Sequence, residues 1–141
     1  MKKRDAANRI HKRKKAAEWM RKKLSSDPAF AILHRLRART SMAIREIKTA
    51  KKLCNTMQLV GCTTDELMLH LQSQFKPGMA WNNRHLWHID HIRPCASFDL
   101  LDAEQQRQCF HYTNLQPLWA MENLSKGSKQ MQNAATGLAP K

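Results

Sequence analysis

One segment, Trp87-His-Ile-Asp-His-Ile-Arg-Pro94, predicts both a strand and a chemical site. Its apolar residues indicate a short strand, which ends at Pro94 because proline has no N–H for a ladder. Within four residues the segment also places one carboxylate and two imidazoles, those of His88, Asp90 and His91. Because burying charge without a partner is costly, an ordinary buried strand rarely carries so many titratable groups. A carboxylate and imidazoles side by side are instead what a divalent metal ion and a general base require.

Two further segments follow this one, His111-Tyr-Thr-Asn-Leu-Gln-Pro-Leu-Trp119 and Glu122-Asn-Leu-Ser-Lys-Gly-Ser-Lys129. Residues 115–119 predict a second short strand, in which a proline at position 117 is tolerable only at a sheet edge. Residues 120–129 predict a helix. The order strand, loop, strand, helix indicates an α+β fold for the second half of the chain.

Together the three segments resemble the HNH endonucleases, and more closely the small phage-type proteins with His-Ile-Asp-His-Ile-x-Pro followed by Asn-Leu-Gln-Pro-Leu-Trp. The resemblance runs from about Gly61 to Lys129 and is specific, because three motifs occur in the right order; a lone Asp-His pair would be weak evidence. It implies a ββα-metal core at about 86–129 within a nuclease domain at 53–130. A basic, mainly helical extension at 1–52 precedes this domain, and a disordered tail at 131–141 follows it.

The charge of +14 lies entirely in the N-terminal third of the sequence. Residues 1–52 hold 18 Lys and Arg against 4 acidic residues, whereas residues 53–141 hold 7 of each. Such asymmetry indicates a polyanionic partner. The resemblance to HNH endonucleases implies that this partner is double-stranded DNA. A solvated basic tail without a specific partner is the alternative.

The rest of the chain is predicted to be largely helical. Residues 2–24 favour a helix by propensity, but crowded like charges oppose it, so we expect ordering on a phosphate backbone. A second helix is expected over about 28–53, with Ser26 or Asp27 as its cap. A third begins at Thr63 with a capping box and stops by residues 76–78, and a fourth, capped by Asp102, extends to about Cys109.

The resemblance implies a role for each motif residue. Asp90 binds the metal ion, and His91 is the general base that removes a proton from water. Asn114 orients the loop that carries this base, and Asn123 supplies a second metal ligand from the helix. Oxygen ligands from Asp90 and Asn123 favour Mg²⁺ or Mn²⁺, with Zn²⁺ and Ni²⁺ as alternatives.

Other polar residues near the motifs have open roles. His88 lies on the same strand face as Asp90, where it is a third metal ligand, a phosphate contact or a structural histidine. His85 and His111 are expected to be structural. The candidate DNA-phosphate contacts, each with a solvated charge as the alternative, are Arg93, Lys126, Lys129, Arg35, Arg39 and Arg45.

Composition excludes several classes. No stretch is long and apolar enough to cross a bilayer, and the basic N-terminus lacks the apolar segment of a secretory signal, so we expect no membrane partner. The four cysteines form no Cys-x-x-Cys pair, which favours reduced thiols in a cytoplasmic protein. If the gene is a phage gene, the compartment is the cytoplasm of the host cell. Their spacing does not offer the two close pairs of a structural zinc site.

These features predict a metal-dependent HNH endonuclease that hydrolyses DNA phosphodiester bonds by nicking or by double-strand cleavage. Two alternatives remain. One is a DNA-binding module without catalysis, and the other is a partner-dependent accessory nuclease subunit of a phage DNA-processing or packaging complex. The sequence does not indicate the target site, the oligomeric state or whether a partner protein is needed.

Overall fold

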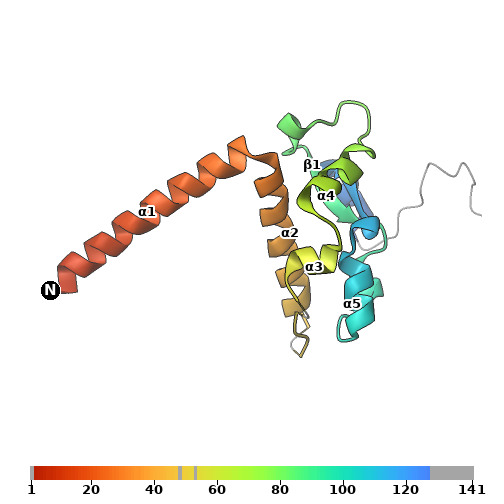
Figure 1. Ribbon diagram of the computed structural model, residues 1–141, viewed down its shortest axis with the longest axis horizontal. Coiled ribbons are helices and arrows are strands. Elements are labelled where there is room, and N and C mark those ends of the chain that lie inside the picture. Colours follow the sequence, from red (N-terminus) through yellow and green to blue (C-terminus); the bar gives the residue numbers. More distant parts are fainter. Residues whose placement is uncertain (1, 48, 53, 128–141) are drawn as a thin grey trace, which may run out of the picture.

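The computed structural model describes residues 2–47, 49–52 and 54–127. It is an α+β structure in which helices surround a small antiparallel sheet (Figure 1). The predicted tail at 131–141 and Lys129 lie outside the described residues. In chain order the helices and strands are α1 (Lys2–Ser26), α2 (Pro28–Arg45), α3 (Thr56–Val60), α4 (Thr64–Gln72), β1 (Trp87–His91), α5 (Ala103–Phe110), β2 (Leu115–Trp119) and α6 (Ala120–Lys126).

The two strands pair antiparallel, with Trp87 opposite Trp119 and His91 opposite Leu115. Both predicted strands are therefore confirmed. Pro117 is tolerated because each strand of a two-stranded sheet is an edge strand. α6 follows β2 without a loop and packs against both strands.

The main core is built around Trp87, which is fully buried. Its indole packs against the rings of Phe75 and Trp81 at centroid distances of 5.1 and 5.6 Å, and its Nε1 donates to the carbonyl of Ala80 at 3.0 Å. Because the one polar atom of this buried indole has a hydrogen-bond partner, burial of its apolar surface stabilises the fold without the cost of an unpaired N–H group. α2 and α4 close this core with apolar side chains that face the sheet, namely Ile32, Leu36, Leu67 and Leu71.

A second cluster joins the C-terminal half of α2 to α3 and α5. Its buried members are Ile44, Leu59, Phe98, Leu100, Cys109 and Phe110. This cluster supports the loop between β1 and α5, and it therefore fixes the chain that follows the first motif.

Three predicted helix starts are confirmed by their caps. Asp27 accepts from the Phe30 N–H at 3.0 Å and Pro28 opens α2. Thr63 and Glu66 form the capping box of α4. Asp102 accepts from the Gln105 N–H at 2.8 Å at the start of α5.

Two helix ends and one whole helix differ from prediction. α2 ends at Arg45 rather than near 53, because the chain tightens into turns in which Ile47 N donates to Ile44 O and Ala50 N to Ile47 O. α4 likewise ends at Gln72 in three-residue turns. α3 was not predicted, although its signals are present in the sequence as an Asn55–Gln58 capping box and a C-terminal glycine.

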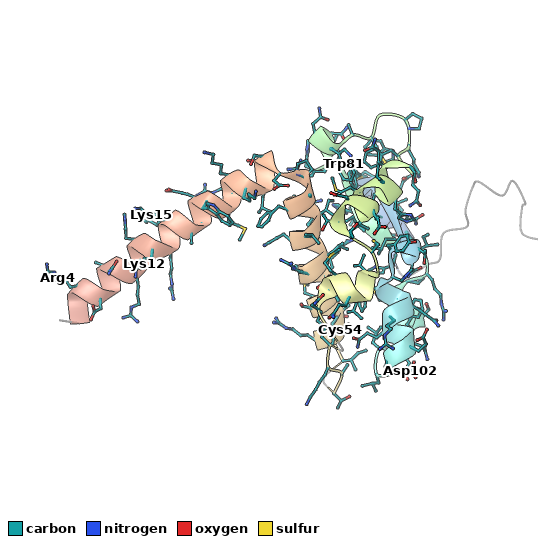
Figure 2. The ribbon with its side chains drawn as sticks, viewed as in Figure 1. Arg4, Lys12, Lys15, Cys54, Trp81 and Asp102 are labelled. Atoms are coloured by element: carbon teal, nitrogen blue, oxygen red, sulfur yellow. The ribbon has the colours of Figure 1, made fainter. Side chains whose placement is uncertain are left out.

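α1 extends away from the rest of the molecule, and its basic side chains, including Arg4, Lys12 and Lys15, project around it (Figure 2). The side chains of residues 4–19 are exposed. Only its last turns contact α2, where the Trp19 ring meets Phe30 edge-on at 5.8 Å. Ordering of this helix on a phosphate backbone stays a prediction. Among the described residues, no helix has the length and apolar character needed to cross a membrane.

Gly61 ends α3 at φ +75°, and a Cβ there would lie 2.8 Å from the His111 ring. We expect Gly61→Ala to lower the free energy of unfolding by about 1–3 kcal/mol, because it adds left-handed backbone strain and a steric clash. Urea denaturation measures this loss. In a His111→Ala background the clash is absent and the loss should be smaller; equal losses in both backgrounds would contradict the contact.

Candidate metal and nucleic-acid site

β1 divides the motif residues between the two faces of the sheet, because successive side chains of a strand point in opposite directions. His88 and Asp90 face α6, where they contact Asn123 and Lys126. His91 faces the other way and packs edge-on against Phe110 of α5, with ring centroids 5.6 Å apart. The side chains of the first motif therefore lie in two separate environments, one on each face of the sheet.

Asp90 is buried in an ion pair with Lys126. The Nζ atom of Lys126 lies 2.5 Å from Oδ2 of Asp90, and Gln116 Nε2 donates to the same oxygen at 3.1 Å. The ammonium also donates to the carbonyl of His91. Lys126 is only 4% exposed, and its ammonium is directed to Asp90. Its contact with a DNA phosphate stays a prediction.

His88 and Asn123 form the second pair on this face, with Nδ1 of His88 and Nδ2 of Asn123 3.1 Å apart. Burial lowers the pKa of His88, and the positive charges of Arg39 and Arg35 lower it further. A lowered pKa favours the neutral imidazole, the form that binds a metal ion. Asp90, His88 and Asn123, all predicted metal ligands, thus lie on one side of the sheet.

Asn114 ties down the chain that follows His91. Its Oδ1 accepts from Arg93 N at 2.9 Å, while its Nδ2 donates to the carbonyls of Arg93 and Cys109 at 3.0 and 2.9 Å. Its backbone carbonyl accepts from Ile92 N at 2.8 Å. This is the positioning contact that the resemblance implies for Asn114; its effect on catalysis stays a prediction.

His91 lies beside two cysteines. Ligand atoms of His91, Cys95 and Cys109 all lie within 4.8 Å of one another. Nε2 of His91 is buried and is the one buried side-chain nitrogen or oxygen without a hydrogen-bond partner in the described part of the chain. Its ring therefore faces sulfur and aromatic carbon, in surroundings that the sequence did not suggest.

The two thiols interact directly, with Cys109 Sγ donating to Cys95 Sγ at 3.3 Å. That hydrogen bond lowers the pKa of Cys95 to about 5, against an opposing effect of burial and with help from His91 and Arg39. The same bond raises the pKa of Cys109. Residue spacing does not indicate this pair, because the two cysteines are 14 positions apart and meet only when α5 packs against the loop after β1.

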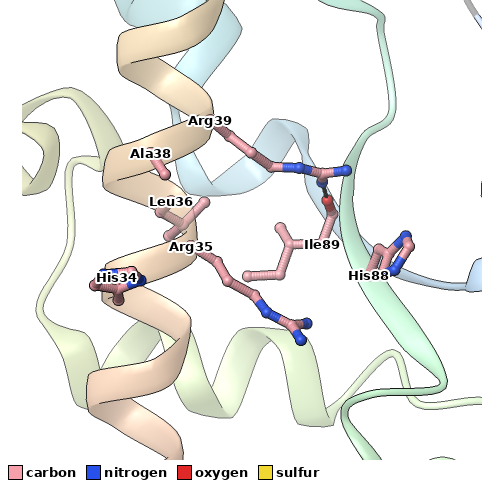
Figure 3. Close-up of a pocket in the computed structure, with 7 residues that line it drawn as sticks. All are labelled: His34, Arg35, Leu36, Ala38, Arg39, His88 and Ile89. Carbon is pink, nitrogen blue, oxygen red and sulfur yellow. Dashed lines mark hydrogen bonds between the residues drawn. The ribbon is translucent and has the colours of Figure 1, made fainter. Parts of the chain in front are cut away.

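A cavity of about 350 Å³ lies between α2 and β1 and is lined by basic side chains (Figure 3). Arg35 and Arg39 reach into it from α2, and His88 from β1. Arg39 donates to the carbonyl of Ile89, and Arg35 to that of Arg84 at 3.2 Å. Burial lowers the pKa of Arg35, as do the charges of Arg84 and Arg39. No acidic residue is among the described lining residues, so this cavity is strongly positive.

The remaining predicted DNA contacts are dispersed. Arg45 is exposed at the end of α2. Arg93 is exposed but folds back, donating to Ser97 and lying over the Phe98 ring at 4.1 Å. His111 is a structural histidine, as predicted, with Nδ1 2.8 Å from the Thr113 hydroxyl.

The curated relatives of this chain include two uncharacterized proteins of Acanthamoeba polyphaga mimivirus. One is 33% identical over 120 residues, which cover 84% of this chain and 51% of the relative. The other is 33% identical over 106 residues, which cover 74% of this chain and 45% of the relative. The chain thus spans about half the length of these relatives. No protein-family model matches the chain. No solved structure matches it either.

The Asp90–Lys126 pair gives a stability prediction. We expect Lys126→Met to lower the free energy of unfolding by roughly 3–5 kcal/mol, because it leaves a buried carboxylate without a partner. Adding Asp90→Asn to that variant should restore part of the loss, since no buried charge remains. Urea denaturation of both single variants and the double variant tests this, and strictly additive losses would show that the two groups are not coupled.

Proposed function

We propose that this chain is a metal-dependent HNH-type endonuclease that hydrolyses DNA phosphodiester bonds. In this proposal β1, β2 and α6 form a ββα-metal core. The observation that carries it is the position of Asp90, His88 and Asn123 on one face of the strand pair, beside a cavity lined by arginines. Carboxylate and imidazole groups next to concentrated positive charge suit the attack on a phosphate ester.

The donor set fits a divalent ion with a preference for oxygen ligands, Mg²⁺ or Mn²⁺. Asp90 would supply a carboxylate oxygen, Asn123 an amide oxygen and His88 a ring nitrogen. When bound, such an ion would neutralise charge on the phosphate and help the 3′ oxygen to leave. The Lys126 ammonium occupies Oδ2 of Asp90, so it would compete with the ion for this oxygen.

Arg39 links the two faces of β1 and would hold the scissile phosphate between them. It lines the basic cavity together with His88, and it also lines a cavity of about 210 Å³ together with His91 and Cys95. A phosphate beside Arg39 would therefore lie near both the metal ligands and the proposed base. His91 would take the proton from water through the smaller cavity, while Asn114 keeps the loop after it in place.

The basic N-terminal region would supply most of the affinity for DNA. α1 presents exposed lysines and arginines along its length, and α2 continues this charge into the basic cavity through Arg35 and Arg39. A second cavity of about 400 Å³ shares Arg35 and is lined by Arg21 and Arg84 at the junction of the two helices. These contacts would be made with phosphates and would carry no base specificity.

A DNA-binding module without catalysis is the second candidate. One observation favours it: the carboxylate proposed to bind metal already has a cation, Lys126, at 2.5 Å. An accessory subunit of a phage packaging or processing complex would differ in needing a partner protein before it cuts.

Relaxation of supercoiled plasmid distinguishes these functions. We expect the wild-type protein to produce open circular plasmid with Mg²⁺ or Mn²⁺, and we expect EDTA to stop this nicking. His91→Ala should bind the plasmid as well as wild type but nick it about 10²–10⁴-fold more slowly, the contribution typical of a general base. Binding without any nicking under either metal would reject catalysis by the isolated chain, and nicking at the wild-type rate by His91→Ala would reject His91 as the base.

Salt dependence tests the role of α1. Replacing Lys12, Lys14 and Lys15 by glutamine should reduce the slope of log affinity against log salt concentration by up to about 2.7, because each neutralised phosphate contributes about 0.9. Fluorescence anisotropy with a labelled duplex at several salt concentrations measures the slope. Arg107→Gln, which removes an exposed charge from α5, is the control and should leave the slope unchanged. An unchanged slope in the triple variant would exclude α1 from the interface.

A further inference from the structure

We propose that His91, Cys95 and Cys109 bind a zinc ion, with a fourth coordination position open to the smaller cavity. The three side chains come from the end of β1, the turn after Pro94 and the last residues of α5. Their ligand atoms lie within 4.8 Å of one another. This group lies on the opposite face of β1 from Asp90, so it is separate from the proposed Mg²⁺ or Mn²⁺ ligands.

The separation of the two sulfurs is close to that expected around tetrahedral zinc. With Zn–S bonds of about 2.3 Å and Zn–N bonds of about 2.0 Å, neighbouring ligand atoms lie roughly 3.5–3.8 Å apart. The two sulfurs are 3.3 Å apart, so they would separate by only a few tenths of an ångström. A small adjustment of this kind is within the reach of a χ1 rotation at Cys95, which is partly exposed.

The chemistry of the donors favours zinc over the hard ions of the other face. Two thiolates and an imidazole are soft or borderline ligands, which select zinc over Mg²⁺ and Ca²⁺. Cys109 Sγ donates to Cys95 Sγ at 3.3 Å, and this contact favours the thiolate form of Cys95, the form that binds a metal ion. Cys109 would release its proton to solvent as the ion binds, with no change in oxidation state. Nε2 of His91 is buried without a hydrogen-bond partner, and its lone pair would be satisfied by coordination to the ion.

The protein also holds these segments in place before any ion binds. Asn114 Nδ2 donates both to the carbonyl of Cys109 and to that of Arg93, two residues after His91. This one amide fixes two of the three ligand-bearing segments, and it limits the ordering that metal binding must produce. The fourth position faces a cavity of about 210 Å³, which has room for a water molecule and is also lined by Glu46.

Zinc at this site would engage the side chain that the proposed nuclease uses as its base. A zinc-bound His91 cannot accept a proton from water, so zinc would inhibit nicking. Zinc binding itself does not rest on the proposed function; only this inhibition does.

Cobalt substitution tests the site without DNA. The full chain, reduced and freed of metal by EDTA and then desalted, is titrated with Co²⁺, whose thiolate charge-transfer band reports sulfur coordination. We expect one equivalent to bind, with zinc displacing it and abolishing the band. Cys95→Ser should lose the band, whereas the matched control, Cys54→Ser with Cys62→Ser, should keep it. Zinc should raise the midpoint of thermal unfolding of wild type and the control but not that of Cys95→Ser.

Far-UV circular dichroism shows whether each variant is folded. If Cys95→Ser is unfolded, His91→Ala takes its place as the test variant. Loss of the imidazole ligand should weaken the charge-transfer band and shift its wavelength. The proposal is overturned if reduced wild type gives no band, if Cys95→Ser keeps the wild-type band, or if the control loses it. It is also overturned if Cys95 and Cys109 oxidise to a disulfide in air equally fast with and without zinc. If the protein binds Co²⁺ as expected but never nicks DNA, catalysis by the isolated chain is rejected and the zinc site is retained.

Discussion

The site depends on the hydrogen bonds of one amide, that of Asn114. It connects the loop after β1 to the end of α5 and to the start of β2, three segments that share no continuous secondary structure. Each of these bonds contributes on the order of 1 kcal/mol net, and leaving the partly buried carbonyl of Cys109 unpaired would cost more. Asn114 thereby fixes the chain after His91 relative to the end of α5, which carries Cys109.

Much of the fold follows from local sequence signals. Caps at Asp27, Thr63 and Asp102 gave three helix starts, and the apolar runs gave both strands. These signals are reliable because they satisfy backbone groups within a few residues. Helix ends were harder to predict: α2 ends eight residues early because the turns after Arg45 are stabilised by packing of Ile44 and Ile47 in the second cluster, a tertiary effect.

The candidate site was only partly predictable, for a geometric reason. The motif places Asp90 beside His91 in sequence, but a strand sends adjacent side chains to opposite faces. Which groups each of them meets depends on α5 and α6, whose positions are set by the whole fold. The burial of Lys126 against Asp90 and the contact between Cys95 and Cys109 arise in this way. Neither has a signature in residue spacing.

α1 makes the molecule asymmetric, with a consequence for how a duplex would lie on it. Its 25 residues span about 38 Å at 1.5 Å per residue, close to the length of one turn of B-DNA. Because α1 joins the remaining chain only through its last turns, β1 lies at one end of this length rather than at its middle. A duplex lying along α1 would be contacted by the protein mainly on one side of the sheet. The protected stretch of DNA would therefore be asymmetric, with the sheet near one end of it.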